Sequence, residues 1–135
     1  MPVPQIAGVD HLSLTVRNLG VSEAWYKELF GLVVVRRKSD SRFETVLLKD
    51  PGSSMLISLR HHFGAGTARF DETRTGLDHV SFAVSRMEDL NEWKKRLEES
   101  HIEHSPISES DSGAVLVFRD PDHIQLEFFF RNQDA

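Results

Sequence analysis

The strongest constraint on the fold of this chain is an internal repeat. Residues 9–37 begin Val-Asp-His-Leu-Ser-Leu-Thr-Val, and residues 77–105 begin Leu-Asp-His-Val-Ser-Phe-Ala-Val. A shared pattern of this length indicates two copies of one supersecondary unit, so each copy places a histidine at the same point of its first strand. Equivalent positions include Asp10 and Asp78, His11 and His79, Ser13 and Ser81, and Trp25 and Trp93.

The length of 135 residues favours one compact domain, residues 1–135, with enough chain to bury a hydrophobic core. The repeat divides this domain into two half-modules, the first at about 7–62 and the second at about 77–131. The connector between them, about 61–76, is long for a link without structure, so it is either a pocket edge or a spacer.

Composition excludes several classes of function. The formal charge of −5 argues against a nucleic-acid surface, which needs a basic patch. No apolar run approaches the roughly 20 residues of a membrane span, and the first residues do not resemble a secretory signal. There is no cysteine, and hence no disulfide, thiolate ligand or cysteine nucleophile. We therefore expect a cytoplasmic protein.

Each half is predicted to contain a strand, a helix and three further strands. In the first half, alternation over 9–16 predicts a half-buried strand. A helix capped by Asn18 or Ser22 is expected to end at Phe30 before Gly31, because Gly is typical of a helix C-terminus. Its predicted apolar stripe is Val21, Trp25 and Leu29, and strands are expected at about 32–38, 43–49 and 54–60.

The second half repeats this plan. A strand at 77–84 precedes a helix at about 87–99, and strands follow at about 102–107, 113–119 and 123–131. The helix is expected to turn Leu90, Trp93 and Leu97 inward. His61 and His62, being adjacent, are interpreted as solvated residues of the connector.

The last strand supplies a third candidate for a metal site. Its apolar residues Ile124, Leu126, Phe128 and Phe130 are expected to pack inward, which leaves Glu127 on the opposite face. A carboxylate between two apolar neighbours is costly to desolvate unless a cation compensates it. His11, His79 and Glu127 together form a set of two imidazoles and one carboxylate that leaves coordination positions open for substrate or oxygen.

A less specific interpretation applies to each of these residues taken alone, because a single strand histidine usually only makes hydrogen bonds. Two histidines at equivalent repeat positions, with a carboxylate in the closing strand, favour a ligand role. Further pocket residues are expected on the same faces as the ligands, namely Ser13, Ser58, Ser81, Gln125 and Phe129.

These pieces resemble the vicinal oxygen chelate superfamily, which contains glyoxalase I, bleomycin-binding proteins, extradiol dioxygenases and fosfomycin-resistance enzymes. The matching segments are Asp10-His11-Leu12, the helix end 25–31, Asp78-His79-Val80, and Asp120-Pro121-Asp122 followed by Leu126-Glu127. The resemblance implies an α+β fold of two βαβββ modules that form a cupped mixed sheet around a divalent metal. It places His11, His79 and Glu127 at three ligand positions of the family.

The chain departs from each branch of that superfamily. Glyoxalase I has a fourth protein ligand on the last strand of the first module, where strand phase puts Ser58 here, or Ile57 if the register moves by one residue. Neither is a good ligand. Extradiol dioxygenases carry a tyrosine where this chain has Val117, and the cationic cluster of fosfomycin thiol transferases is reduced to Arg119.

The resulting hypothesis is a metal-dependent enzyme that acts on a small oxygen-bearing organic molecule. The metal, Fe2+, Mn2+, Zn2+ or Ni2+, would act as a Lewis acid. A dioxygenase-like reaction is ranked slightly above a glyoxalase-like or lyase reaction. The alternative is a binding protein of the bleomycin-resistance type that sequesters a drug or metabolite. A homodimer is expected, because half-modules expose sheet edges.

Overall fold

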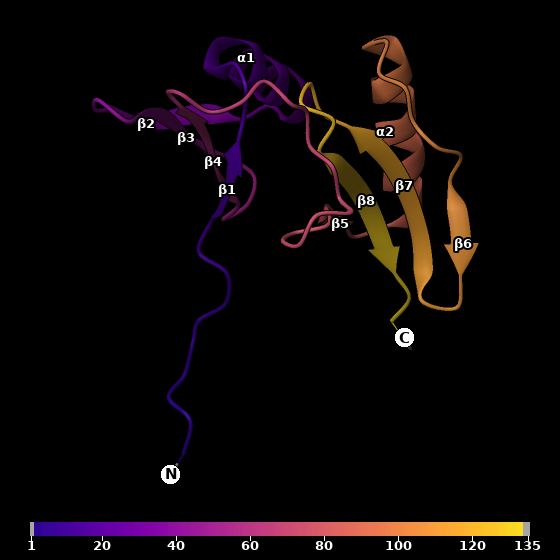
Figure 1. Ribbon diagram of the computed structural model, residues 1–135. Helices are drawn as coiled ribbons and strands as arrows, with labels where there is room; N and C mark the ends of the chain where they lie inside the picture. The colour runs from indigo at the N-terminus through magenta and orange to yellow at the C-terminus, as the bar shows by residue number, and fades with distance from the viewer. Residues whose placement is uncertain (1, 134–135) are drawn as a thin grey trace. The chain divides into compact units, whose positions relative to one another are not determined.

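The computed structural model describes residues 2–133. The chain forms two compact units, Met1–Thr67 and Ala68–Ala135, and the boundary falls inside the predicted connector. Each unit contains one four-stranded sheet with one helix against it (Figure 1).

The first unit contains β1 (Leu12–Thr15), α1 (Leu19–Phe30), β2 (Val33–Ser39), β3 (Phe43–Lys49) and β4 (Leu56–His62). Its strand order is β1-β4-β3-β2. The first strand pairs in parallel with the last, whereas β3 pairs antiparallel with both of its neighbours. This is a mixed βαβββ module.

The second unit contains β5 (Val80–Val84), α2 (Met87–Glu99), β6 (Ser108–Ser110), β7 (Gly113–Arg119) and β8 (Gln125–Arg131). Its strand order, β5-β8-β7-β6, repeats that of the first unit, and β5 is parallel to β8. The predicted α+β class with two βαβββ modules is therefore confirmed, and the repeat is structural as well as sequential.

Helix α1 has the predicted ends but a different buried stripe. The Oδ1 atom of Asn18 accepts the backbone N–H of Val21, and Gly31 ends the helix with a φ of +69°. The buried residues are Ser22, Tyr26 and Leu29, whereas Val21 is 54% exposed. The prediction is confirmed for Leu29 but wrong for Val21, because Ser22 and Tyr26 face the sheet instead.

Helix α2 follows the prediction closely. It spans Met87–Glu99, and Leu90 and Leu97 are fully buried. The ring of Trp93, on α2, stacks on that of Phe128 in β8, with centroids 4.2 Å apart. This packing fixes the phase of β8, so that Glu127 lies on the helix-free face of the second sheet.

The strand predicted at 102–107 is displaced to Ser108–Ser110. Before it, only His104 forms a bridge with β7, opposite Phe118. The backbone N–H of Val117 donates to the hydroxyl of Ser105. In a regular antiparallel ladder it would donate to a backbone carbonyl. Pro106 has no N–H to donate, so regular pairing is interrupted at this point.

The interpretation of His61 and His62 as solvated connector residues was also wrong. Strand β4 continues through both residues, and both are partly buried. The Nδ1 atom of His61 lies 3.2 Å from the carbonyl oxygen of Val16, and the ring of His62 meets the ring of Phe43 edge-on. Pairing with β3 thus extends the first module to its last predicted residue and shortens the connector.

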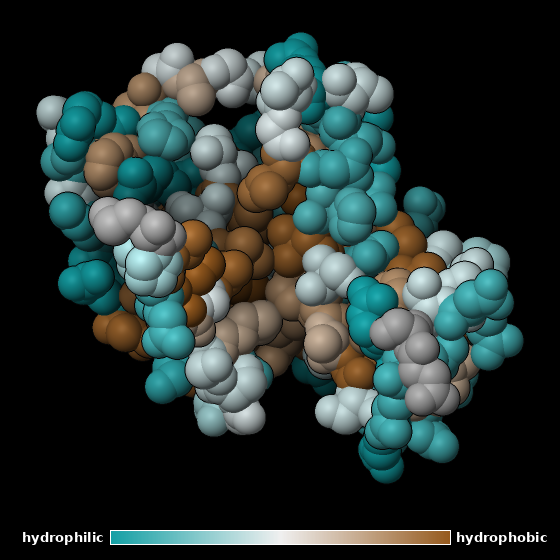
Figure 2. Space-filling view, turned by 90° about the horizontal axis from the view of Figure 1, so that it is seen from below, coloured by the Kyte–Doolittle hydropathy of each residue, from teal (hydrophilic) through white to brown (hydrophobic). Residues whose placement is uncertain are grey.

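Some large apolar side chains remain at the surface, where brown residues are visible in Figure 2. Edge strand β2 exposes 49% of Val33, 37% of Val34 and 52% of Val35. Neither helix in residues 2–133 has the length and apolar content that a membrane-spanning segment needs.

We predict that Gly113→Ala will destabilise the second unit. Gly113 begins β7 with a φ of +149°, and a Cβ there would lie 1.8 Å from the carbonyl oxygen of Phe130. The free energy of unfolding should fall by more than about 2 kcal/mol, measured by urea denaturation. Gly66→Ala is the control because open space surrounds that position. Equal stability of both variants would contradict this account.

Candidate functional site

Both predicted histidine ligands are held by the aspartate that precedes them. In the first unit, Nδ1 of His11 lies 2.7 Å from Oδ2 of Asp10. In the second unit, Nδ1 of His79 lies 2.8 Å from Oδ1 of Asp78. An ionised carboxylate only accepts hydrogen bonds, so each imidazole donates through Nδ1.

This hydrogen bond determines which histidine nitrogen is available. A proton on Nδ1 leaves Nε2 unprotonated in the neutral ring, with its lone pair free for a ligand. Metal-binding histidines in proteins commonly donate their second ring N–H to a carboxylate, which fixes the tautomer and the ring orientation. The repeat therefore duplicates a histidine together with the group that orients it.

The second unit brings His79 and Glu127 together. Strands β5 and β8 are parallel, and Ser81 lies directly opposite Glu127. Cross-strand partners project from the same face, and His79 stands immediately before β5, two residues before Ser81. The Nε2 atom of His79 lies 3.5 Å from Oε1 of Glu127, whose side chain is only 12% exposed.

The spacing between these two atoms fits a shared divalent ion. Two ligand atoms that each lie about 2.1 Å from one metal ion are about 3.0 Å apart at adjacent octahedral positions and about 3.4 Å apart in a tetrahedral site. The free lone pair of His79 and the largely buried carboxylate of Glu127 are also the donor types that such ions take.

His11, the third predicted ligand, belongs to the first unit and lies just before β1. Within residues 2–133, no group of three or more His, Cys, Asp or Glu side chains is arranged to hold a metal ion. The structure thus brings together two of the three predicted ligands.

Ser58 lies on the helix-free face of the first sheet, opposite Ser13 across the β1–β4 pair. Ile57 and Leu59 face the other way and are almost fully buried in the core. Of the two registers considered from the sequence, the structure therefore has the one that places Ser58, and not Ile57, beside Ser13. Ser58 itself is only 6% exposed.

The predicted pocket residues of the second unit share a face with Glu127. Gln125 and Phe129 are two residues away from it on β8, on either side, and Ser81 is its cross-strand partner. The Oε1 atom of Gln125 accepts a hydrogen bond from Arg119 at 3.3 Å. Because an arginine can only donate, this bond leaves the NH2 group of Gln125 free to donate elsewhere.

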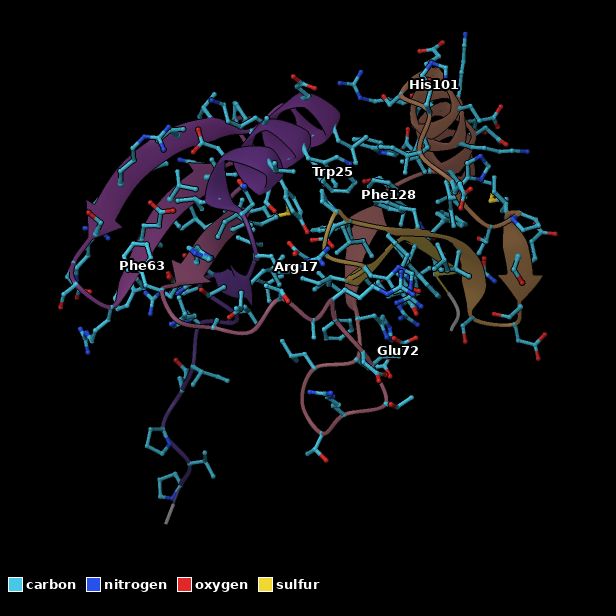
Figure 3. All side chains as sticks on the ribbon, turned by 45° about the horizontal axis from the view of Figure 1, so that its top comes forward. Arg17, Trp25, Phe63, Glu72, His101 and Phe128 are labelled. Carbon is cyan, nitrogen blue, oxygen red and sulfur yellow. The ribbon has the colours of Figure 1, made fainter. Side chains whose placement is uncertain are left out.

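Arg119 is engaged by the connector. Its guanidinium donates to both carboxylate oxygens of Glu72, at 2.8 and 3.2 Å, and to the carbonyl oxygen of His123. Nearby, the backbone N–H of Phe70 donates to the carbonyl oxygen of Asp122. Figure 3 shows Glu72 on the connector that precedes β5. This part of the connector is therefore attached to the second sheet, and Arg119 already has a carboxylate partner.

Sequence reasoning missed three of these residues. Asp10 and Asp78 were aligned by the repeat, but their position immediately before each histidine, which is the signal for an orienting role, was not used. Glu72 had no such signal, because nothing in the composition of the connector indicates which arginine it meets.

Comparison with known proteins identifies the relatives of this chain. The sequence model of the Glyoxalase/Bleomycin resistance protein/Dioxygenase superfamily matches residues 8–128. A solved glyoxylase/bleomycin resistance protein/dioxygenase domain from Frankia sp. EAN1pec is 40% identical, covers 95% of this chain and 100% of its own, and superposes with a TM-score of 0.88.

Bacterial relatives of the chain carry activity names. The chain is 25% identical over 126 residues to a Bacillus subtilis (strain 168) protein provisionally named as the ring-cleaving dioxygenase MhqA. That match covers 86% of this chain but 38% of the relative, so the chain spans well under half of that protein. The trivalent organoarsenical cleaving enzyme of Bacillus sp. (strain MD1) is 28% identical over 125 residues, covering 89% of this chain and 71% of the relative.

We predict that the Glu72–Arg119 pair persists well into the acid range. The hydrogen bond from Arg119 lowers the pKa of Glu72 from 4.5 to about 2. Because the folded-state pKa is depressed, the contribution of this pair is complete above pH 4.5 and is lost as the pH falls through about 2. Carbon-13 NMR of the Glu72 carboxyl group should give a midpoint near the lower value.

Arg119→Met should return that midpoint towards 4.5, the ordinary glutamate value. Arg86→Met is the control, because it removes the partner of Asp89 instead. A wild-type midpoint near 4.5 would show that Glu72 is not held by Arg119 in solution.

Proposed function

The chain belongs to the Glyoxalase/Bleomycin resistance protein/Dioxygenase superfamily, and from this premise we propose that it is a divalent-metal-dependent enzyme acting on a small oxygen-bearing organic molecule. The observation that carries the proposal is the 3.5 Å separation between Nε2 of His79 and Oε1 of Glu127, with Nδ1 of His79 engaged by Asp78. Two donor atoms so placed suit one cation.

In this proposal His11, His79 and Glu127 are the protein ligands. The Asp10–His11 hydrogen bond supports His11 as the third, because it repeats the arrangement at His79 in the other half of the chain. Two imidazoles and one carboxylate suit Fe2+, Mn2+, Zn2+ or Ni2+. A bound ion would supply a Lewis acid that stabilises negative charge on substrate oxygens.

The residues beside the ligands have distinct roles in this proposal. The NH2 group of Gln125, whose oxygen is turned to Arg119, donates a hydrogen bond to a substrate oxygen. Phe129 supplies an apolar wall, and the guanidinium of Arg131 lies 4.7 Å from the centre of its ring. Ser81 lies opposite Glu127 and donates through its hydroxyl without acting as a nucleophile.

We favour an oxygenase reaction over an isomerase or lyase reaction. Ser58 lies on the strand face where a fourth protein ligand would lie, but its hydroxyl is a poor metal ligand. A metal held by three protein ligands has more open coordination positions than one held by four. The likeness to the MhqA relative supports the same choice. Cleavage of trivalent organoarsenicals is disfavoured, because trivalent arsenic is soft and binds thiolates, and the chain contains no cysteine.

We predict that the purified protein binds one divalent ion and that the ligand variants lose it. His79→Ala and Glu127→Gln should each weaken metal binding by more than the 10–100-fold typical of orienting groups. Asp78→Asn, which disturbs only the orienting carboxylate, should fall within that range. Elemental analysis and metal titration measure the series.

His101→Asn is the matched control, since His101 is an exposed histidine after α2 and asparagine tolerates its φ of +57°. Once a substrate is found, a chelator should abolish turnover and added Fe(II), Mn(II) or Zn(II) should restore it. Equal metal content in wild type and His79→Ala would refute the ligand assignment. If the metal-loaded protein binds a small molecule but does not convert it, the alternative of a binding protein that sequesters a drug or metabolite would be favoured.

We further predict a homodimer. Edge strand β2 is uncovered and exposes three consecutive valines, Val33–Val35, and exposed apolar edges are usually buried by association. Light scattering at micromolar concentration should therefore report about twice the chain mass of 15.4 kDa. A particle of the single-chain mass would contradict this expectation.

A further inference from the structure

The helix-free face of the first sheet, the face opposite α1, has an unusual charge. One row of neighbouring residues crosses it as Thr15, Arg60, Thr45 and Lys38, and a second as Ser13, Ser58, Leu47 and Arg36. Lys49 lies on the same side beside Leu56 and Val33. Four basic residues therefore share this face.

No carboxylate of strands β1–β4 projects from that face. The one acidic residue in these strands is Glu44, which pairs with His61 and Ser39 and so belongs to the opposite phase. In a chain with a formal charge of −5, basic residues without acidic neighbours on one sheet face create a local positive potential. Such a potential attracts an anionic ligand.

Arg60 is the most constrained of these basic residues. Its Nε atom donates to Oγ1 of Thr45 at 3.1 Å, and its guanidinium carbon lies 4.0 Å from the centre of the Phe43 ring. The side chain is partly buried. Two fixed contacts hold the guanidinium in place, so its orientation is set before any ligand arrives.

The terminal nitrogens of Arg60 have no hydrogen-bond or ion-pair partner in residues 2–133. Four other arginines pair with carboxylates, in Arg37–Glu23, Arg42–Asp40, Arg86–Asp89 and Arg119–Glu72, whereas the exposed Arg36 has no such ion pair in residues 2–133. A partly desolvated cation without a counter-ion is unfavourable, and stacking on Phe43 offsets only part of that cost. An anion from outside the chain would complete its environment.

Ser58 provides a second donor beside Arg60. It lies two residues earlier on β4, roughly 6–7 Å along the strand and on the same face. Its hydroxyl makes no hydrogen bond with another described residue. Every fully buried polar side-chain atom in residues 2–133 has a hydrogen-bond partner, so the hydroxyl oxygen of Ser58 is not fully buried. The hydroxyl therefore retains some accessible surface, although Ser58 as a whole is only 6% exposed.

We propose that Arg60, assisted by Ser58, binds the oxyanion group of a small ligand, a carboxylate or a phosphate. Because Nε donates to Thr45, the two terminal nitrogens remain available to donate two parallel hydrogen bonds to two oxygens of one anionic group. Lys38 and Arg36 add longer-range attraction. The inference goes beyond the proposed function, and every residue that carries it belongs to the first unit.

The test uses full-length protein stripped of metal by a chelator, so that anion binding is measured apart from metal binding. Benzoate and inorganic phosphate are titrated as the carboxylate and phosphate probes, and neutral benzamide is the control. NMR follows the Nε–H resonance of Arg60 and the backbone amide of Ser58. At least one anion should shift both signals in a saturable way, and benzamide should not.

Arg60→Gln should weaken binding about tenfold, as expected from losing a charge-assisted hydrogen bond. Arg36→Gln is the matched control: it removes the same charge from the same face but should change affinity less than threefold. Arg60→Lys, which keeps the charge without the fork, should fall between them and guards against misfolding of Arg60→Gln. All three variants should bind metal like wild type.

Response to benzoate alone, to phosphate alone or to both supports the site and identifies its anion. No saturable response to either anion, an equal response to benzamide, or equal losses in Arg60→Gln and Arg36→Gln would overturn it. Loss of metal binding in His79→Ala together with intact anion binding would separate the two sites. Failure of metal binding in wild type would count against the proposed enzyme and leave the anion site standing.

Discussion

The parallel pairing of the first and last strands of each module is the constraint on which the candidate site depends. It places β4 beside β1 and β8 beside β5, although long segments separate them in the chain. Parallel neighbours with a fixed register project matching residues from one face. Glu127 therefore stands opposite Ser81 and within reach of His79, and Ser58 stands opposite Ser13.

The helices determine which face of each sheet remains available. Each module covers one side of its sheet with a helix, whose buried residues include Leu29 in α1 and Leu97 in α2. Polar side chains on the opposite side then escape the full cost of burial, provided that they find hydrogen bonds or ions. The candidate ligands and the Arg60 site both lie on such helix-free faces, in different units.

The two helix-free faces differ in charge although their folds repeat. The face of the second sheet carries Glu127 and Arg119, and the carboxylate of Glu72 in the connector balances the charge of Arg119. The first has no strand carboxylate, and Arg60 rests on Phe43. A duplicated backbone can thus support different chemistry, because side chains on a solvent-facing strand position are free to diverge while the core positions keep their hydrophobic alternation.

Sequence alone determined the modular architecture, both helices within a residue or two, and the face of Glu127, because local periodicity and capping are physically local. Only the tertiary structure decided that Ser22 faces the sheet and that β4 extends through His62, because packing and strand pairing depend on residues distant in the chain. The same holds for the Glu72–Arg119 pair and for the contacts of Arg60 with Thr45 and Phe43. Each requires knowing which side chains meet, and a single sequence carries no such information.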